Sequence, residues 1–398
     1  MAPESAPREL WARGAEAPTE LPVDDLWSDV VRIHAMGEQP AQALCIRHCG
    51  EVVLDRVVGA VDPAKPPIGA NRATPETLFN LFSASKILTA AVVQGLVERG
   101  RLSLDERVAD TLPAFGRGIR QHIRLHHLLH HTAGCPDMPS DLAPEQALSD
   151  IPGVVARLAE MPLKTAPGTA VAYHPMSAWA ILSEVVRHRT DRDLRSLAHE
   201  LIEGPMGLAQ FNYGVREVDL KRVALHAPAG LQNVPVMEGI FRRTVGVSSA
   251  EAIRLSNTPA FLQAVLPSAN VVATARDTSA FLQMLLDGGR WRGTQLLAAP
   301  TVARMLEDET PRAFDGTFGF PMRYGLGLMK GGRRFSLFGP RTRRAFGHLG
   351  FSNVLVYADP DRQLVMVLLN TGKPLLAWSM VPWAVLVQKI ALVVPRGR

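Results

Sequence analysis

The chain has 398 residues, of which 47% are hydrophobic and 20% are charged, and this composition excludes an intrinsically disordered protein. Its length suits one large domain, or two domains that share a core. The formal net charge is +5, but the arginines that supply most of it are scattered and are not interleaved with aromatic residues. The sequence therefore predicts no nucleic-acid partner.

The composition of the N-terminal segment predicts no secretory signal. The first 14 residues contain acidic residues and prolines but no apolar core, so they do not resemble a secretory signal. The three cysteines, Cys45, Cys49 and Cys135, are too sparse for a disulfide framework. We therefore expect a cytoplasmic protein. Residues 1–24 are expected to form a loose N-terminal tail, because Pro, Ala and Glu are frequent there.

Apolar periodicity predicts the elements that follow this tail. In chain order, the first are a helix over residues 25–36, a β-hairpin of strands over 41–48 and 52–59, a long helix from Ser83 to Gly100, and a short helix between residues 102 and 113. The pattern is then mainly helical up to residue 290, with the clearest helices at residues 154–161, 178–187, 194–202 and 277–286. Residues 231–267 lack one clear period, and we interpret them as a candidate pocket wall.

Strands return near the C-terminus. Residues 346–356 and 364–370 predict two strands around a turn at residues 359–362. Residues 375–394 are mostly apolar, and about 20 such residues would suffice to cross a bilayer. A proline, a glutamine and a lysine interrupt this stretch, however. We interpret it as a buried helix that packs on the sheet and predict no membrane span.

The order of the elements predicts an α+β fold. An antiparallel β-sheet would be built from both ends of the chain and flanked by the N- and C-terminal helices, with a mainly helical domain inserted. We place the sheet domain at residues 25–110 and 310–398, and the inserted helical domain at residues 111–309. A cleft between the two would be the natural ligand site.

The most informative motif is Ser83-Ala84-Ser85-Lys86, at the start of the long apolar helix. A serine and a lysine three residues apart at a helix start lie on the same face. The hydroxyl would then lie beside an amine and near backbone N–H groups that have no partner within the helix. Such surroundings can make a hydroxyl nucleophilic without a histidine, and S-x-x-K is a signature of serine nucleophiles.

Two later segments carry further candidate site residues. Tyr173 follows a Pro167-Gly168 turn and precedes a predicted helix, so its hydroxyl can point into a cleft. Gly347-His348-Leu349-Gly350 enters the strand that continues at Phe351. A glycine at this place would let a ligand lie against the strand edge.

With these motifs, the chain resembles the serine β-lactamase-like family, specifically its class C and esterase-like branch, the family VIII carboxylesterases. The resemblance runs from about residue 41 to residue 370, and the following segments also carry it in the same order: residues 102–105, 112–113, 125–134, 205–208, 273–277 and 324–327. It implies the β-lactamase/transpeptidase-like fold, a small-molecule ester as substrate, and no cofactor.

The resemblance also implies a role for each candidate residue. Ser83 would be the acylated nucleophile. Lys86 would help to remove its proton, which requires a depressed lysine pKa. Tyr173 would share the base role and later protonate the leaving group, and either residue could take the first proton. The backbone N–H groups of Ser83 and Phe351 would form the oxyanion hole, with the segment His348 to Gly350 in place of the third family motif.

Two departures from the class C pattern bear on the substrate. Pro175 stands at the asparagine position of the Tyr-x-Asn motif and offers no side-chain amide. His348 stands where the third motif begins with lysine, and histidine is largely neutral near pH 7. Both changes weaken recognition of anionic β-lactams and peptides and fit carboxylesterases. We therefore expect a serine hydrolase that cleaves carboxylic esters through an acyl-enzyme on Ser83.

Three alternatives stay open on the sequence alone. An acyltransferase would form the same acyl-enzyme and differ only in its acceptor. A β-lactamase, D-amino-acid amidase or D-amino-acid peptidase would use the same residues on an amide. A non-catalytic binding protein on this scaffold is the third, although the intact Ser83, Lys86 and Tyr173 count against it.

Two residue clusters are given structural interpretations. Four histidines lie between residues 126 and 131, but no nearby carboxylate completes a metal site and Cys135 is isolated. We therefore predict no metal. Three arginines between residues 341 and 344 are interpreted as part of a solvated loop, with attraction of an acidic acyl carrier as the alternative.

Overall fold

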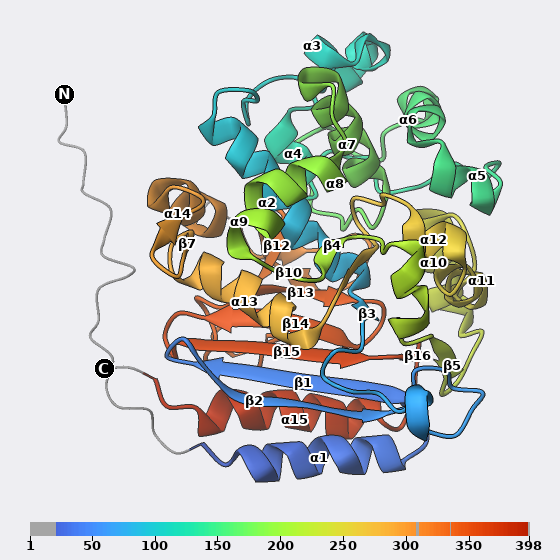
Figure 1. Cartoon of the computed structure of the whole chain (residues 1–398). Coiled ribbons are helices and arrows are strands. Elements are labelled where there is room, and N and C mark those ends of the chain that lie inside the picture. The colour runs from blue at the N-terminus through green and yellow to red at the C-terminus, as the bar shows by residue number, and fades with distance from the viewer. Residues whose placement is uncertain (1–20, 308–309, 335, 397–398) are drawn as a thin grey trace.

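A seven-stranded antiparallel sheet forms the base of the computed structural model, which describes residues 21–307, 310–334 and 336–396 (Figure 1). The strand order is β11-β12-β13-β14-β15-β1-β2, so both ends of the chain build it, as predicted. Its strands are β1 (Ala41–His48), β2 (Glu51–Gly59), β11 (Tyr324–Gly325), β12 (Leu328–Lys330), β13 (Phe346–Gly350), β14 (Val354–Asp359) and β15 (Leu364–Asn370). The predicted α+β fold is confirmed. Most of the predicted tail, residues 1–24, lies outside the described residues.

Helices cover both faces of this sheet. In Figure 1, α1 (Val23–Ala35) and α15 (Met380–Val393) lie below it, and α13 (Ala275–Leu286) lies above it. Every residue of β1 is buried. Successive side chains of a strand point to opposite faces, so Ala43 and Cys45 join the upper core while Leu44 and Ile46 join the lower one.

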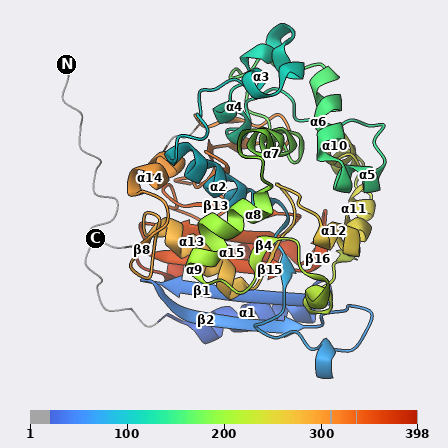
Figure 2. The same cartoon turned by 45° about the horizontal axis from the view of Figure 1, so that its top comes forward.

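The remaining helices form the upper part of the molecule (Figure 2). They are α2 (Lys86–Glu98), α3 (Val108–Thr111), α4 (Leu125–Leu129), α5 (Pro144–Ser149), α6 (Ile151–Glu160), α7 (Ser177–Thr190), α8 (Leu194–Ala198), α9 (Gly204–Met206), α10 (Pro235–Val245), α11 (Ser249–Ser256), α12 (Pro259–Gln263) and α14 (Ala299–Glu307). The division into two domains stays a prediction. Helix α13, which the sequence analysis placed in the helical insertion, packs against β1, β14 and β15 of the sheet.

Short strands complete the fold. A three-stranded sheet has the order β3-β6-β4 and lies next to the start of α2. The short strands are β3 (Phe79–Asn80), β4 (Phe211–Tyr213), β5 (Ala227–Ala229), β6 (Val271–Ala273), β7 (Arg290–Trp291), β8 (Thr294–Gln295), β9 (Ala313–Phe314), β10 (Pro321–Met322) and β16 (Gly372–Pro374).

Two predicted elements differ from the structure, and the stretch without a clear period is helical. Residues 346–356 form two strands, because the chain reverses between Gly350 and Val354 through the polar turn residues Ser352 and Asn353. Residues 231–267 hold the helices α10, α11 and α12. The short helix expected between residues 102 and 113 is confined to α3.

The C-terminal helix packs on the sheet, as predicted, but it is shorter and less buried than expected. It begins at Met380, and only one side of it joins the lower core. Val381, Val385 and Leu392 on its outer side are 63%, 57% and 64% exposed. Within the described residues, no helix combines the length and the apolarity needed to cross a bilayer.

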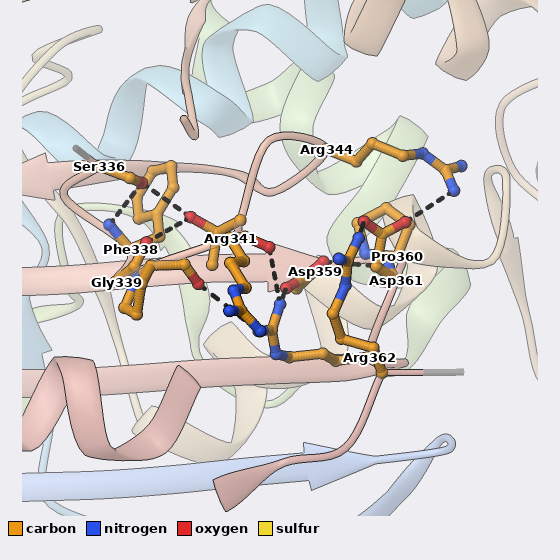
Figure 3. Close-up of polar contacts among 12 residues, drawn as sticks. Ser336, Phe338, Gly339, Arg341, Arg344, Asp359, Pro360, Asp361 and Arg362 are labelled. Atoms are coloured by element: carbon orange, nitrogen blue, oxygen red, sulfur yellow. Dashed lines mark hydrogen bonds and ion pairs between the residues drawn. The ribbon is translucent and has the colours of Figure 1, made fainter. Parts of the chain in front are cut away.

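The arginine-rich loop before β13 is exposed at Arg341, Arg343 and Arg344, as expected for a solvated loop. Beneath it, Arg362 and Asp359 form a buried ion pair with an N–O distance of 2.6 Å (Figure 3). Arg362 also donates to the backbone oxygen of Arg341 at 3.1 Å. Burial raises the pKa of Asp359, and Arg362 counteracts this rise.

We expect Arg362→Met to lower the free energy of unfolding by about 3–5 kcal/mol, because it leaves Asp359 buried without its counter-charge. The matched control is Arg344→Met, which removes an exposed ion pair to Asp361 from the same region and should cost about 1 kcal/mol or less. Urea denaturation of both variants measures the difference. Equal, small losses would show that the buried pair does not stabilise the fold.

Candidate active site

Ser83 lies in a tight turn, residues Phe82–Ser85, that leads directly into α2. Phe82 adopts a left-handed conformation with φ of 46°, which is uncommon for a bulky residue and needs support from its surroundings. Asn80 accepts a hydrogen bond from the N–H of Phe82 at 3.2 Å, and Ser85 accepts one from the N–H of Val271 at 2.9 Å. The turn is thus fixed to the small sheet β3-β6-β4.

Lys86 is the hydrogen-bond partner of the Ser83 hydroxyl. Its Nζ lies 3.1 Å from Ser83 Oγ and donates to the backbone oxygen of Ser268 at 3.2 Å. The side chain is fully buried, and the rings of Tyr173 and Trp179 lie 5.2 and 5.5 Å from Nζ. This burial lowers the pKa of Lys86 well below its usual value. The amine is therefore suited to accept a proton from Ser83.

Tyr173 completes the predicted group of three. It lines the same cavity as Ser83, and its buried hydroxyl forms no hydrogen bond within the described structure. Burial raises the pKa of Tyr173 and the charge of Asp315 raises it further, while the nearby Ser83 hydroxyl offsets part of the rise. At neutral pH the side chain is therefore a phenol that can donate a proton.

The third predicted segment lies against this group. A Cβ atom on Gly350 would be only 2.4 Å from the backbone oxygen of Leu81, so glycine is needed where β13 meets the Ser83 turn. Gly350 also lines the cavity, and its contact with a substrate stays a prediction. Phe351 lines the cavity, and its ring centroid lies 5.6 Å from that of Phe82. The oxyanion-hole role of the Ser83 and Phe351 N–H groups stays a prediction.

His348 lies beside Tyr173 but does not line the cavity. Its ring centroid is 5.9 Å from that of Tyr173, and the side chain is fully buried. Burial and the nearby Lys86 lower the pKa of His348 to about 3, so the imidazole is uncharged at neutral pH. Substrate contact by His348 remains a prediction that this placement does not support.

The Ser83 hydroxyl opens onto a cavity of about 510 Å³. None of the described residues that line it carries a charged side chain. The stretch without a clear period, residues 231–267, supplies a large part of the wall, so its interpretation as a pocket wall is confirmed. Its bulkiest apolar lining residues are Met237, Ile240, Phe241, Leu255 and Phe261.

Some residues of the site were missed at the level of sequence. Trp179, Ser268 and Asp315 contact Lys86 or Tyr173, but no local motif marks them. His131 was considered only for a metal, yet its buried ring lies 4.7 Å from that of Tyr173, and its Nδ1 accepts the N–H of His174. Across the described ranges, no three His, Cys, Asp or Glu side chains are arranged to hold a metal ion.

The profile of the beta-lactamase family matches residues 30–379 of the chain. This protein belongs to the beta-lactamase family. The resemblance inferred from the motifs is thereby confirmed, and with it membership of a fold family of serine hydrolases.

Relatives of this beta-lactamase-family chain include both esterases and penicillin-binding proteins. Esterase/beta-lactamase LipL of Mycobacterium tuberculosis is 26% identical over 305 residues, which cover 73% of this chain and 68% of LipL. A penicillin-binding protein homologue from Caulobacter crescentus is 25% identical, with a TM-score of 0.77 and coverage of 93% of this chain and 98% of its own. A family VIII carboxylesterase shares the fold at 23% identity and a TM-score of 0.77, over 94% and 98% of the two chains.

Proposed function

We propose that this protein hydrolyses uncharged, apolar carboxylic esters through an acyl-enzyme on Ser83. The observation that carries the proposal is the 3.1 Å contact between Ser83 Oγ and the amine of the fully buried Lys86, at the edge of a cavity without charged walls. The contact would activate the Ser83 hydroxyl as a nucleophile. The uncharged lining of the cavity favours uncharged, apolar substrates.

The opposite pKa shifts of Lys86 and Tyr173 favour Lys86 as the first base. Its neutral amine takes the hydroxyl proton while Ser83 Oγ bonds to the ester carbonyl carbon. The N–H groups of Ser83 and Phe351 stabilise the resulting oxyanion, and such donors contribute about 3–4 kcal/mol each. As the C–O bond to the alcohol breaks, the phenol of Tyr173 protonates the leaving oxygen, and the ammonium of Lys86 then reprotonates Tyr173. In the second half, water attacks the acyl carbon and Lys86 takes its proton. The bond to Ser83 Oγ then breaks, Tyr173 protonates that oxygen, and the acid is released.

The walls of the cavity argue against anionic substrates. Burying a carboxylate among apolar side chains without a partner costs several kcal/mol. Pro175 lines the cavity where the class C motif has an asparagine, and no charged residue was found in the described lining. β-Lactams and peptides that carry a carboxylate are therefore disfavoured relative to neutral esters.

A series of p-nitrophenyl esters from acetate to octanoate tests the proposal. The value of kcat/KM should rise by up to about fourfold per added methylene, because each buried CH₂ contributes about 0.8 kcal/mol. The matched control, Ser83→Ala, should show no turnover above background and no labelling by a fluorophosphonate probe.

Retained turnover in Ser83→Ala would contradict the assignment of the nucleophile, and nitrocefin turnover that rivals the esters would favour a β-lactamase. An acyltransferase would form the same acyl-enzyme. Product analysis with added 1-butanol, in which a new butyl ester competes with the free acid, separates it from a hydrolase.

A further inference from the structure

Asp315 is a fully buried carboxylate that contacts the backbone of Tyr173. It lies between β9 and β10, far from Tyr173 in sequence. Its two oxygens accept the backbone N–H of Tyr173 at 3.0 and 3.1 Å. One oxygen also accepts the hydroxyl of Tyr324 at 2.7 Å, and the other accepts the N–H groups of Thr317 and Phe318 at 2.8 and 2.9 Å.

The residues that follow Asp315 enclose Tyr173 from two further sides. The hydroxyl of Thr317 donates to the backbone oxygen of Tyr173 at 2.8 Å. The ring of Phe318 stacks on the ring of Tyr173, with centroids 4.8 Å apart and an angle of 21° between the planes. Residues 315–318, which we call the clamp loop, therefore hold both backbone polar groups and one ring face of Tyr173. The phenol hydroxyl is left without a partner within the described structure.

A neutral side chain could not replace this carboxylate. An asparagine at position 315 would offer one acceptor oxygen and turn an NH₂ group toward donors that need an acceptor. A buried carboxylate is costly unless its hydrogen bonds are satisfied, and no lysine or arginine pairs with Asp315 among the described ion pairs. The donors that satisfy it come largely from Tyr173 and from the loop packed on Tyr173.

We propose that Asp315 is a positioning residue: it holds Tyr173 so that the phenol hydroxyl lies where the leaving group of the substrate departs. This inference rests on the proposed function, in which Tyr173 protonates that leaving group. Thr317 and Phe318 also line the cavity, so the clamp loop joins the wall that meets the substrate to the residue that donates the proton.

Leaving-group dependence provides the test, because p-nitrophenolate departs without a proton whereas an alkoxide needs one. We expect Asp315→Asn to lower kcat/KM, which reports only the acylation step in which the two leaving groups differ, at least about tenfold more for ethyl butyrate than for p-nitrophenyl butyrate. Tyr173→Phe should show the same pattern to a larger extent. A residue that only stabilises the fold would lower both rates by the same factor.

The control is Arg362→Met, which weakens the fold away from the cavity and should leave the ratio of the two rates at the wild-type value. If Asp315→Asn does not fold, Asp315→Glu carries the test, since it keeps the charge but adds one methylene and so displaces the carboxylate from the backbone N–H of Tyr173. A wild-type ratio in the folded variant would overturn the inference. A different result would contradict the proposed function itself: a wild-type enzyme that cleaves neither ester, or that cleaves them equally well as Ser83→Ala.

Discussion

Replacement of Lys86 by methionine is expected to lower kcat/KM for ester hydrolysis by about 10²- to 10⁴-fold, the usual contribution of a general base. Methionine has a similar length and no charge, so it suits the space between the rings of Tyr173 and Trp179. Because a buried amine is costly to desolvate, the free energy of unfolding should not fall. Steady-state kinetics and thermal unfolding of the same preparation measure both quantities.

The chain offers a matched control for this variant in Lys373. It is also fully buried, and burial lowers its pKa well below the usual value as well. Its Nζ donates to the backbone oxygen of Asn370 at 2.6 Å instead of contacting Ser83. Lys373→Met should therefore retain most of the activity. An equal loss in both variants would mean that removal of any buried amine, and not loss of a base, impairs the enzyme.

The pH profile provides a second measurement on Lys86. Only the neutral amine can act as a base, so the rate should rise with pH as Lys86 loses its proton. Because burial lowers this pKa, the rise should be complete well below the value of about 10.4 for an ordinary lysine. An ascending limb centred near that value would show that Lys86 is not the base.

Tyr173→Phe is expected to lower kcat for alkyl esters by about 10²- to 10⁴-fold, because the proton for the leaving oxygen is lost. Phenylalanine preserves the stacking with Phe318, which lies 4.8 Å away, so the fold should persist. In the double variant with Lys86→Met, the losses should not multiply, since both residues serve one proton relay. Kinetics on the single and double variants test this, and strictly multiplicative losses would indicate independent roles.

Short-range patterns carried most of the fold prediction. The hairpin β1–β2 matches the predicted strands closely, and Gly100 has the positive φ of 65° expected after a helix C-terminus. The strand predicted over residues 346–356 failed because its apolar run hides a reversal, which depends on pairing between β13 and β14. Ser83 and Lys86 could be placed together because residues three positions apart at the start of a helix lie on the same face.

The remaining site residues depend on tertiary contacts. Asp315 meets Tyr173 only after the chain has folded around the cavity, so no spacing rule reveals it. His348 was assigned to the substrate from its motif, but side chains alternate along a strand. Leu349, its neighbour in β13, lines the cavity, whereas His348 does not, and its ring lies 5.9 Å from that of Tyr173.

The absence of charge in the described cavity wall also bears on how each reaction cycle ends. In the proposed reaction, the acid that leaves Ser83 would ionise at neutral pH, and its negative charge would be surrounded by side chains that cannot solvate it. Under this proposal the ionised product would favour bulk water, whereas a neutral ester would favour the cavity. We therefore expect the free acid to be only a weak product inhibitor.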